Sequence, residues 1–200
     1  MTELSIVRVF VGSGGTGGNP LGVFLDGPAV ATGRQAIAAH LGFSETVFVD
    51  EVTDGEAWIT IHTPAAELAF AGHPTVGTSW LLREVGMPVE VVRVRAGAVA
   101  TWPDGDLTWI RARAAWVHPL VIDELGDPAA VDAVTPPVMG APGRYVWAWE
   151  DESAGRLRAR YFPTDLGIAE DEATGAAAVV MGERLGRPVT IRQGLSLIHI

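Results

Sequence analysis

The stretch AELAFAGHPTVGTSWLLREVG, residues 66–86, decides the fold of this sequence. An apolar segment turns through Gly72 and His73 into a helical pattern that stops at Gly86. Pro74 suits a first helical position because its missing N–H would be unpaired there anyway, and glycine is favoured just after a helix. We therefore expect a buried helix over residues 74–85, whose N-terminus presents free backbone N–H groups.

A second stretch, FPTDLGIAEDEATGAAAVVMGERLG at residues 162–186, echoes the first. When the first stretch is extended back to Thr63, each stretch runs from a proline in an extended segment, Pro64 or Pro163, through a loop into a small apolar helix that ends in glycine. A shift of 98 positions aligns His73 with Asp171, Gly77 with Gly175, and Thr78 with Ala176. An internal repeat indicates two similar units, so we expect a second central helix over residues 173–185. Chance similarity between glycine-rich helix starts is the alternative.

Strand-like segments surround both helical stretches, which is typical of an α+β protein. We predict two pseudo-symmetric lobes, each a mostly antiparallel, barrel-like sheet around one central helix. The N-terminal lobe is expected over residues 1–100 and the C-terminal lobe over residues 101–194. The segment GSGGTG at residues 12–17 matches the dinucleotide pattern G-x-G-x-x-G, but a proline and a β-like run follow it instead of a helix. We interpret this segment as a flexible loop.

The composition excludes several classes of function. The 200 residues include no cysteine, so disulfides and thiol nucleophiles are unavailable. There is no lysine and the net charge is −10, which argues against nucleic-acid binding. No apolar run approaches the roughly 18 residues of a membrane span, and no secretory signal pattern opens the chain. We therefore expect a cytoplasmic protein. The five histidines lack metal-ligand spacing, so we expect no metal, and the chemistry expected below calls for no cofactor.

The C-terminal residues 195–200 do not continue the preceding pattern naturally. They match the peptide that a common sequencing adapter encodes, so we interpret them as a non-native tail. A natural last strand is the alternative. We expect the C-terminal lobe to be incomplete, with an open sheet edge after Arg192.

Three polar residues stand near the predicted helix starts or in an apolar strand, and each has an ordinary structural explanation. His73 taken alone is a capping or structural histidine. Glu45, in GFSETVFV, is a solvent-facing strand residue, and Asp171 is an acidic residue favoured by the helix dipole. Alternation, however, places Glu45 on one strand face with Phe43 and Val47, which is unusual for a merely solvated carboxylate.

Four segments together resemble the PhzF-like phenazine-biosynthesis family, which shares the diaminopimelate epimerase fold. They are GNPLGV at residues 18–23, GFSETVFV at 42–49, AGHPTVGT at 71–78 and EDEATGAA at 170–177. Their order and spacing follow the family over nearly the whole chain. The resemblance implies two similar lobes, each wrapped on a central helix, with the site between them.

The resemblance also implies roles for single residues. The family's catalytic glutamate falls on Glu45, its site histidine on His73 and its site aspartate on Asp171. Two positions depart from the family motif E-D-P-A-T-G-S: its proline is Glu172 here, and its serine is Ala176. Alanine cannot hydrogen-bond a substrate, so the family's dihydro-hydroxyanthranilate substrate does not follow for this chain.

The chemistry that these expectations support is proton transfer between carbon atoms. Glu45 is expected to carry the proton, with a pKa raised by burial. The N–H groups of the two helix starts are expected to bind a substrate carboxylate. The residues predicted for this binding are Gly72, Thr75, Val76, Thr174, Gly175 and Ala176.

The sequence thus predicts a cofactor-independent isomerase that acts on a small carboxylate-bearing metabolite. A small-carboxylate-binding protein that has lost turnover is the second hypothesis, and a purely structural dimer module is the third. A homodimer is among the expectations for assembly.

Overall fold

The computed structural model describes residues 3–194 and 196–200, and it divides into two compact units. The first unit runs up to Val9 and continues over Pro20–Trp116, and the second comprises Phe10–Asn19 and Val117–Ile200. The expected boundary at residue 100 falls inside a strand, Gly97–Asp104, that pairs on both of its edges. The chain passes from the first unit to the second after Trp116.

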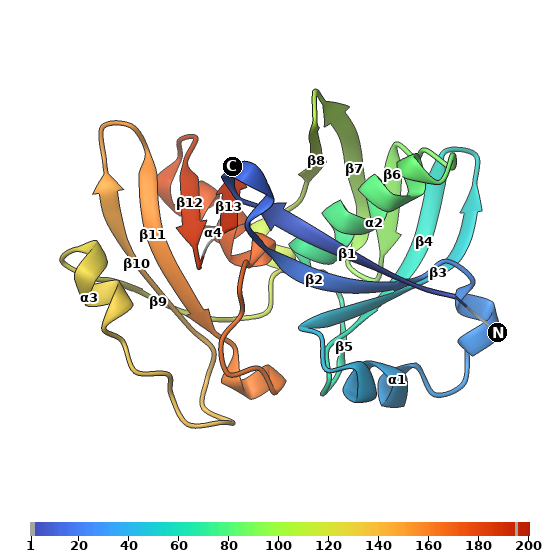
Figure 1. Cartoon of the computed structure of the whole chain (residues 1–200), viewed down its shortest axis with the longest axis horizontal. Helices are drawn as coiled ribbons and strands as arrows, with labels where there is room; N and C mark the ends of the chain where they lie inside the picture. Colours follow the sequence, from blue (N-terminus) through green and yellow to red (C-terminus); the bar gives the residue numbers. More distant parts are fainter. Residues whose placement is uncertain (1–2, 195) are drawn as a thin grey trace. The chain divides into compact units, whose positions relative to one another are not determined.

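The first unit is built on an eight-stranded sheet in the order β1-β2-β3-β4-β6-β7-β8, with β5 paired to β4 (Figure 1). Its strands are β1 (Leu4–Val11), β2 (Gly17–Phe24), β3 (Glu45–Thr53), β4 (Glu56–His62), β5 (Glu67–Leu68), β6 (Val91–Val94), β7 (Gly97–Asp104) and β8 (Leu107–Arg111). The helices of this unit are α1 (Arg34–Leu41) and α2 (Gly72–Glu84), with 3-10 turns at Gly27–Val30 and Ala114–Trp116.

A tight turn sets the register of the β3–β4 hairpin. Asp54 and Gly55 connect the two strands, and both residues have positive φ angles, 49° and 75°. This is the conformation that a two-residue hairpin turn needs, and Asp-Gly is among the sequences that adopt it most readily. The register that follows places Glu45, Val47 and Val49 on one face of β3.

The sheet of the first unit curves around α2, the first expected central helix (Figure 1). The helix begins at Gly72 and ends at Glu84, within two residues of the prediction. Gly77 lets it approach the sheet closely, because a Cβ atom there would lie 2.6 Å from a methyl group of Val9 and 2.7 Å from one of Leu21. The sheet contacts therefore hold the first turns of α2, including His73, in the interior of the unit.

The second unit holds a five-stranded sheet in the order β13-β12-β11-β10-β9 (Figure 1). Its strands are β9 (Val121–Glu124), β10 (Arg144–Asp151), β11 (Arg156–Phe162), β12 (Thr190–Gln193) and β13 (Ser196–His199). Its helices are α3 (Pro128–Asp132) and α4 (Gly175–Leu185), with 3-10 turns at Ser13–Gly15 and Thr164–Leu166. The second central helix thus begins two residues later than predicted.

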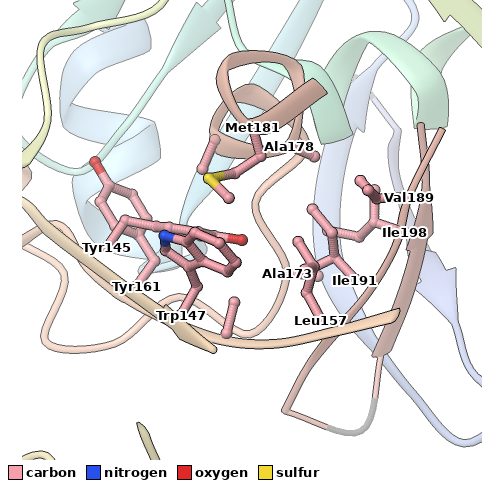
Figure 2. Close-up of a cluster of buried hydrophobic side chains, with 12 residues drawn as sticks. Tyr145, Trp147, Leu157, Tyr161, Ala173, Ala178, Met181, Val189, Ile191 and Ile198 are labelled. Atoms are coloured by element: carbon pink, nitrogen blue, oxygen red, sulfur yellow. The ribbon is translucent and has the colours of Figure 1, made fainter. Parts of the chain in front are cut away.

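The two faces of this second sheet carry separate cores, as alternation along β10 and β11 requires. On one face α4 packs over a buried cluster that includes Trp147, Leu157 and Met181 (Figure 2). On the other face α3 packs over Val146 and Phe162.

The last strand fills the edge that the sequence predicted to be open. β13 pairs antiparallel with β12, and Ile200 exchanges two backbone hydrogen bonds of 2.9 Å with Val189. Ile198 is buried in the α4 core, and Ser196 is fully buried. The expectation of an open edge after Arg192 is therefore wrong, because the alternating residues 196–199 supply an apolar face. Leu195 lies outside the described residues.

The predicted fold class is confirmed: the chain is α+β, with two mixed sheets and few helices. Antiparallel pairings outnumber parallel ones among the described strands, although β2–β3, β4–β6, β9–β10 and β11–β12 are parallel.

Candidate functional site

Glu45 and His73, which are far apart in sequence, form a buried pair in the first unit. Glu45 opens β3 on the face that looks toward α2, and His73 is the second residue of α2. Nδ1 of His73 lies 3.1 Å from Oε2 of Glu45. Relative exposure is 8% for Glu45 and 2% for His73. The structure thus brings together two of the three predicted catalytic residues as a desolvated carboxylate–imidazole pair.

The pKa of the Glu45 carboxyl is shifted in the direction opposite to the prediction. Burial raises this pKa, but the charge of His73 and hydrogen bonds from His73 and Ser44 outweigh it, so the pKa lies below its ordinary value. The expected raised pKa is wrong because the sequence did not reveal which side chain would face the carboxylate. The neighbouring groups therefore favour the ionised form of Glu45.

The lowered pKa of Glu45 predicts a loss of stability in acid. A carboxyl whose pKa is lower in the folded state than in the unfolded state stabilises the fold above its unfolded pKa, and this contribution disappears as the pH falls through the folded pKa. With the ordinary value at 4.5, the wild type should lose more unfolding free energy between pH 7 and pH 3 than Glu45→Gln does. Urea unfolding of both proteins at a series of pH values measures this difference. Parallel stability curves would contradict it.

The first turn of α2 holds the other site residues predicted for this unit. Gly72 and Thr75 are buried and Val76 is half-buried. The residue before the helix, Ala71, is extended and its methyl side chain cannot cap the helix. The Thr75 hydroxyl donates to the Ala71 carbonyl at 2.7 Å, so it tightens the turn. The helix start is thus buried and without a capping side chain among the described residues, as the sequence led us to expect.

Asp171, the third predicted catalytic residue, lies in the second unit within a buried polar network. It is 5% exposed and precedes α4. Its Oδ1 accepts a hydrogen bond from Nδ2 of Asn19 at 2.7 Å, and its Oδ2 accepts one from the Thr174 hydroxyl at 2.5 Å. Its backbone N–H donates to the Tyr161 carbonyl at 2.9 Å.

The N-terminus of α4 is held by a glutamine from β12. Oε1 of Gln193 accepts from the Thr174 N–H at 3.3 Å, and its Nε2 donates to the Thr174 hydroxyl at 2.9 Å and to the Asp171 carbonyl at 2.7 Å. Among the predicted binding residues of this helix, Thr174 and Gly175 are buried and Ala176 is half-buried. The Thr174 N–H, predicted to bind a substrate anion, donates within the protein in this structure.

Sequence reasoning missed Asn19 and Gln193 as members of this network. Asn19 lies inside the GNPLGV segment, but nothing in the segment indicates its partner, which is 152 positions away. Gln193 stands in an ordinary strand-like run. Only information that links positions far apart in the sequence could have identified either residue as a partner of Asp171.

Two further features bear on the chemistry. Within residues 3–194 and 196–200, no group of three or more His, Asp or Glu side chains is placed to hold a metal ion. Each helix described in the chain falls short of the length and apolar character that crossing a membrane requires.

The first unit also has a cavity of about 700 Å³ near the end of α2, with Arg83, Glu90 and Trp102 in its lining. None of the predicted site residues lines this cavity. The buried pair of Glu45 and His73 therefore does not line this cavity.

Comparison with known proteins gives consistent matches. A family model described as phenazine biosynthesis-like protein, PhzC-PhzF, matches residues 7–107. The chain is 31% identical over 216 residues to the trans-2,3-dihydro-3-hydroxyanthranilate isomerase of Pseudomonas chlororaphis, a match that covers 88% of this chain and 77% of that protein. It is 40% identical over 88 residues to an uncharacterized isomerase of Pasteurella multocida.

The Pasteurella match covers 42% of this chain and 30% of that relative, so the chain spans only part of the length of some relatives. The crystal structure of the PhzF-family phenazine biosynthesis protein of Bacillus anthracis is similar with a TM-score of 0.78 and 21% identity, covering 96% of this chain and 86% of that one. This likeness concerns the fold alone. Since the family model spans half of the chain and the Pseudomonas relative most of it, the chain belongs to the PhzC-PhzF family of phenazine biosynthesis-like proteins.

Proposed function

We propose that this protein is an isomerase that moves a proton between carbon atoms of a small carboxylate-bearing metabolite and needs no cofactor to do so. The observation that carries the proposal is the buried pair of Glu45 and His73 at the start of α2. A carboxylate in a desolvated site, oriented by one imidazole, is a group that can accept and return a proton. The isomerase names of the relatives support the same class of reaction.

Glu45 takes the central role in this proposal. As an ionised carboxylate it removes a proton from one carbon atom, and the neutral acid then formed delivers that proton to another. Nδ1 of His73, 3.1 Å away, orients the carboxylate and stabilises its charge in the resting state. His73 thus keeps Glu45 in the basic form before the substrate binds.

The helix starts are proposed as the groups that bind the substrate carboxylate. Backbone N–H groups and the helix dipole at an N-terminus favour an anion without lysine or arginine. In α2 we assign this role to the turn that contains Gly72, Thr75 and Val76. In the second unit we assign the corresponding anion-binding role to the turn of α4 that contains Thr174, Gly175 and Ala176, in which the N–H of Thr174 donates to Gln193 in the resting protein, and we assign to Asp171 the role of contacting polar groups of a substrate.

Deuterium incorporation tests this function. The purified protein is incubated in heavy water with trans-2,3-dihydro-3-hydroxyanthranilate, the compound named for the Pseudomonas relative, and with other small carboxylates. Mass spectrometry and NMR should find deuterium on carbon in substrate or product, because the neutral acid that Glu45 forms during turnover can exchange its proton with solvent before it delivers that proton to carbon. A complete lack of both deuterium incorporation and isomerised product across the panel would contradict an isomerase.

A non-catalytic carboxylate-binding protein is the second candidate, and one observation favours it. The family motif carries a serine where this chain has Ala176, which offers no hydroxyl to a substrate. Binding of a carboxylate detected by calorimetry, together with absent deuterium exchange, would support this candidate over the isomerase.

A further inference from the structure

Two backbone carbonyl oxygens determine which atoms donate and which accept in the hydrogen bonds around Asp171. A carbonyl oxygen only accepts, so the amide nitrogen must be the side-chain atom that faces it. Nδ2 of Asn19 donates to the Ala173 carbonyl at 3.0 Å, and Nε2 of Gln193 donates to the Asp171 carbonyl at 2.7 Å. Both amide groups are therefore fixed in orientation.

The fixed amides determine what Asp171 receives. The same Nδ2 of Asn19 that faces the Ala173 carbonyl donates its other hydrogen to Oδ1 of Asp171. Nε2 of Gln193 donates to the Thr174 hydroxyl, which leaves the single hydroxyl hydrogen for Oδ2 of Asp171 at 2.5 Å. Both carboxylate oxygens of Asp171 thus accept hydrogen bonds, and hydrogen bonds of this kind favour the charged form.

We propose that Asn19 and Gln193 are positioning residues that hold Asp171 as a permanent carboxylate anion in one orientation. Asn19 acts on Oδ1 directly, and Gln193 acts on Oδ2 through Thr174. Asp171 then contributes fixed negative charge to the reaction and carries no proton, which leaves proton transfer to Glu45. This role of Asp171 in the reaction rests on the proposed function, whereas the orientation of its carboxylate by Asn19 and Gln193 does not.

Gly17 and Gly18, at the end of the glycine-rich segment, have a structural role in this arrangement. Gly17 and Gly18 have φ angles of 67° and 85°, which side chains other than glycine rarely adopt. The Gly18 N–H donates to the buried Ser196 hydroxyl at 3.0 Å. These two residues begin β2 inside the second unit, where Asn19, only 2% exposed, reaches Asp171.

Titration of the Asp171 carboxyl by NMR tests the proposal without requiring activity. The protein is labelled with carboxyl ¹³C at aspartate, and the Asp171 signal is assigned by its loss in Asp171→Asn. In the wild type the carboxyl should remain ionised at pH 5, and in Asn19→Ala its titration midpoint should rise by about one pH unit, as loss of a charge-assisted hydrogen bond requires. Gln193→Met should raise the midpoint by less, because Gln193 acts through Thr174.

Gln35→Met is the matched control, because Gln35 is another amide that binds backbone carbonyls, those of Thr63 and Pro64, in the first unit. This variant should leave the Asp171 midpoint unchanged. Equal midpoints in wild type and Asn19→Ala would overturn the proposal. Protonation of Asp171 above pH 5 in the wild type would also overturn it, and that measurement needs Asp171→Asn only to assign the signal.

Kinetics separate this inference from the proposed function. If the wild type exchanges deuterium, the acidic limb of its pH–rate profile should move to higher pH in Asn19→Ala, a shift that a purely structural role would not produce. An unmoved limb would contradict the role in the reaction. A raised NMR midpoint in a protein that shows no exchange would refute the isomerase and leave the positioning of Asp171 standing.

Discussion

Replacing Glu45 with glutamine should lower the rate of proton transfer by about 10²–10⁴-fold, the usual contribution of a general acid–base group. Glutamine keeps the size and shape of the side chain but cannot accept a proton at neutral pH. Substrate binding should persist, because the proposal assigns it to the backbone N–H groups of the helix starts. Deuterium exchange into trans-2,3-dihydro-3-hydroxyanthranilate, or into whichever carboxylate the wild type turns over, measures the rate, and calorimetry measures the binding.

Glu51→Gln is the matched control for this experiment. Glu51 lies on the same strand, β3, but its side chain is exposed. The Glu51→Gln variant should incorporate deuterium into the substrate at the wild-type rate. His73→Ala should weaken binding as well as rate, because it removes the partner of Glu45 and alters the first turn of α2. Unchanged exchange in Glu45→Gln would refute the assignment of Glu45 as the proton carrier.

Replacing Ile198 with alanine should lower the free energy of unfolding by about 2–5 kcal/mol, the usual cost of a cavity left by a large aliphatic side chain. Ile198 is 2% exposed and belongs to the core that α4 covers, together with Met181 and Ile191 (Figure 2). A neighbouring contact shows how tightly this region packs, because a Cβ atom on Gly182 would lie 2.4 Å from a methyl group of Ile200. Urea unfolding of both proteins at neutral pH measures the difference.

His199→Ala provides the control for this loss. His199 is the next residue of β13 and points to the opposite, exposed side, where its ring contacts only the Thr190 hydroxyl among the described hydrogen bonds. Its replacement should change the unfolding free energy by less than about 0.5 kcal/mol, as is usual for surface positions. Equal stability of wild type and Ile198→Ala would show that residues 196–200 do not belong to the folded core.

The sequence by itself determined the features that depend on neighbours along the chain. The Asp54-Gly55 turn, the start of α2 near Pro74 and the end of α1 before Gly42 all follow from local backbone preferences. Alternation along β3 placed Glu45 on the same face as Val47, although both faces of the strand are buried over its first five residues. These signals act over a few residues, so a single sequence displays them completely.

Only the tertiary structure decided which distant side chains meet. It paired His73 with Glu45 and thereby reversed the expected direction of the Glu45 pKa shift. It also brought Asn19 and Gln193 to Asp171 and placed Ser196–His199 on the free edge of β12. The physical reason is that the pKa of a buried carboxyl depends on the few groups within hydrogen-bond reach. Folding brings those groups together from positions far apart in the sequence, and local sequence patterns do not show which of them will meet.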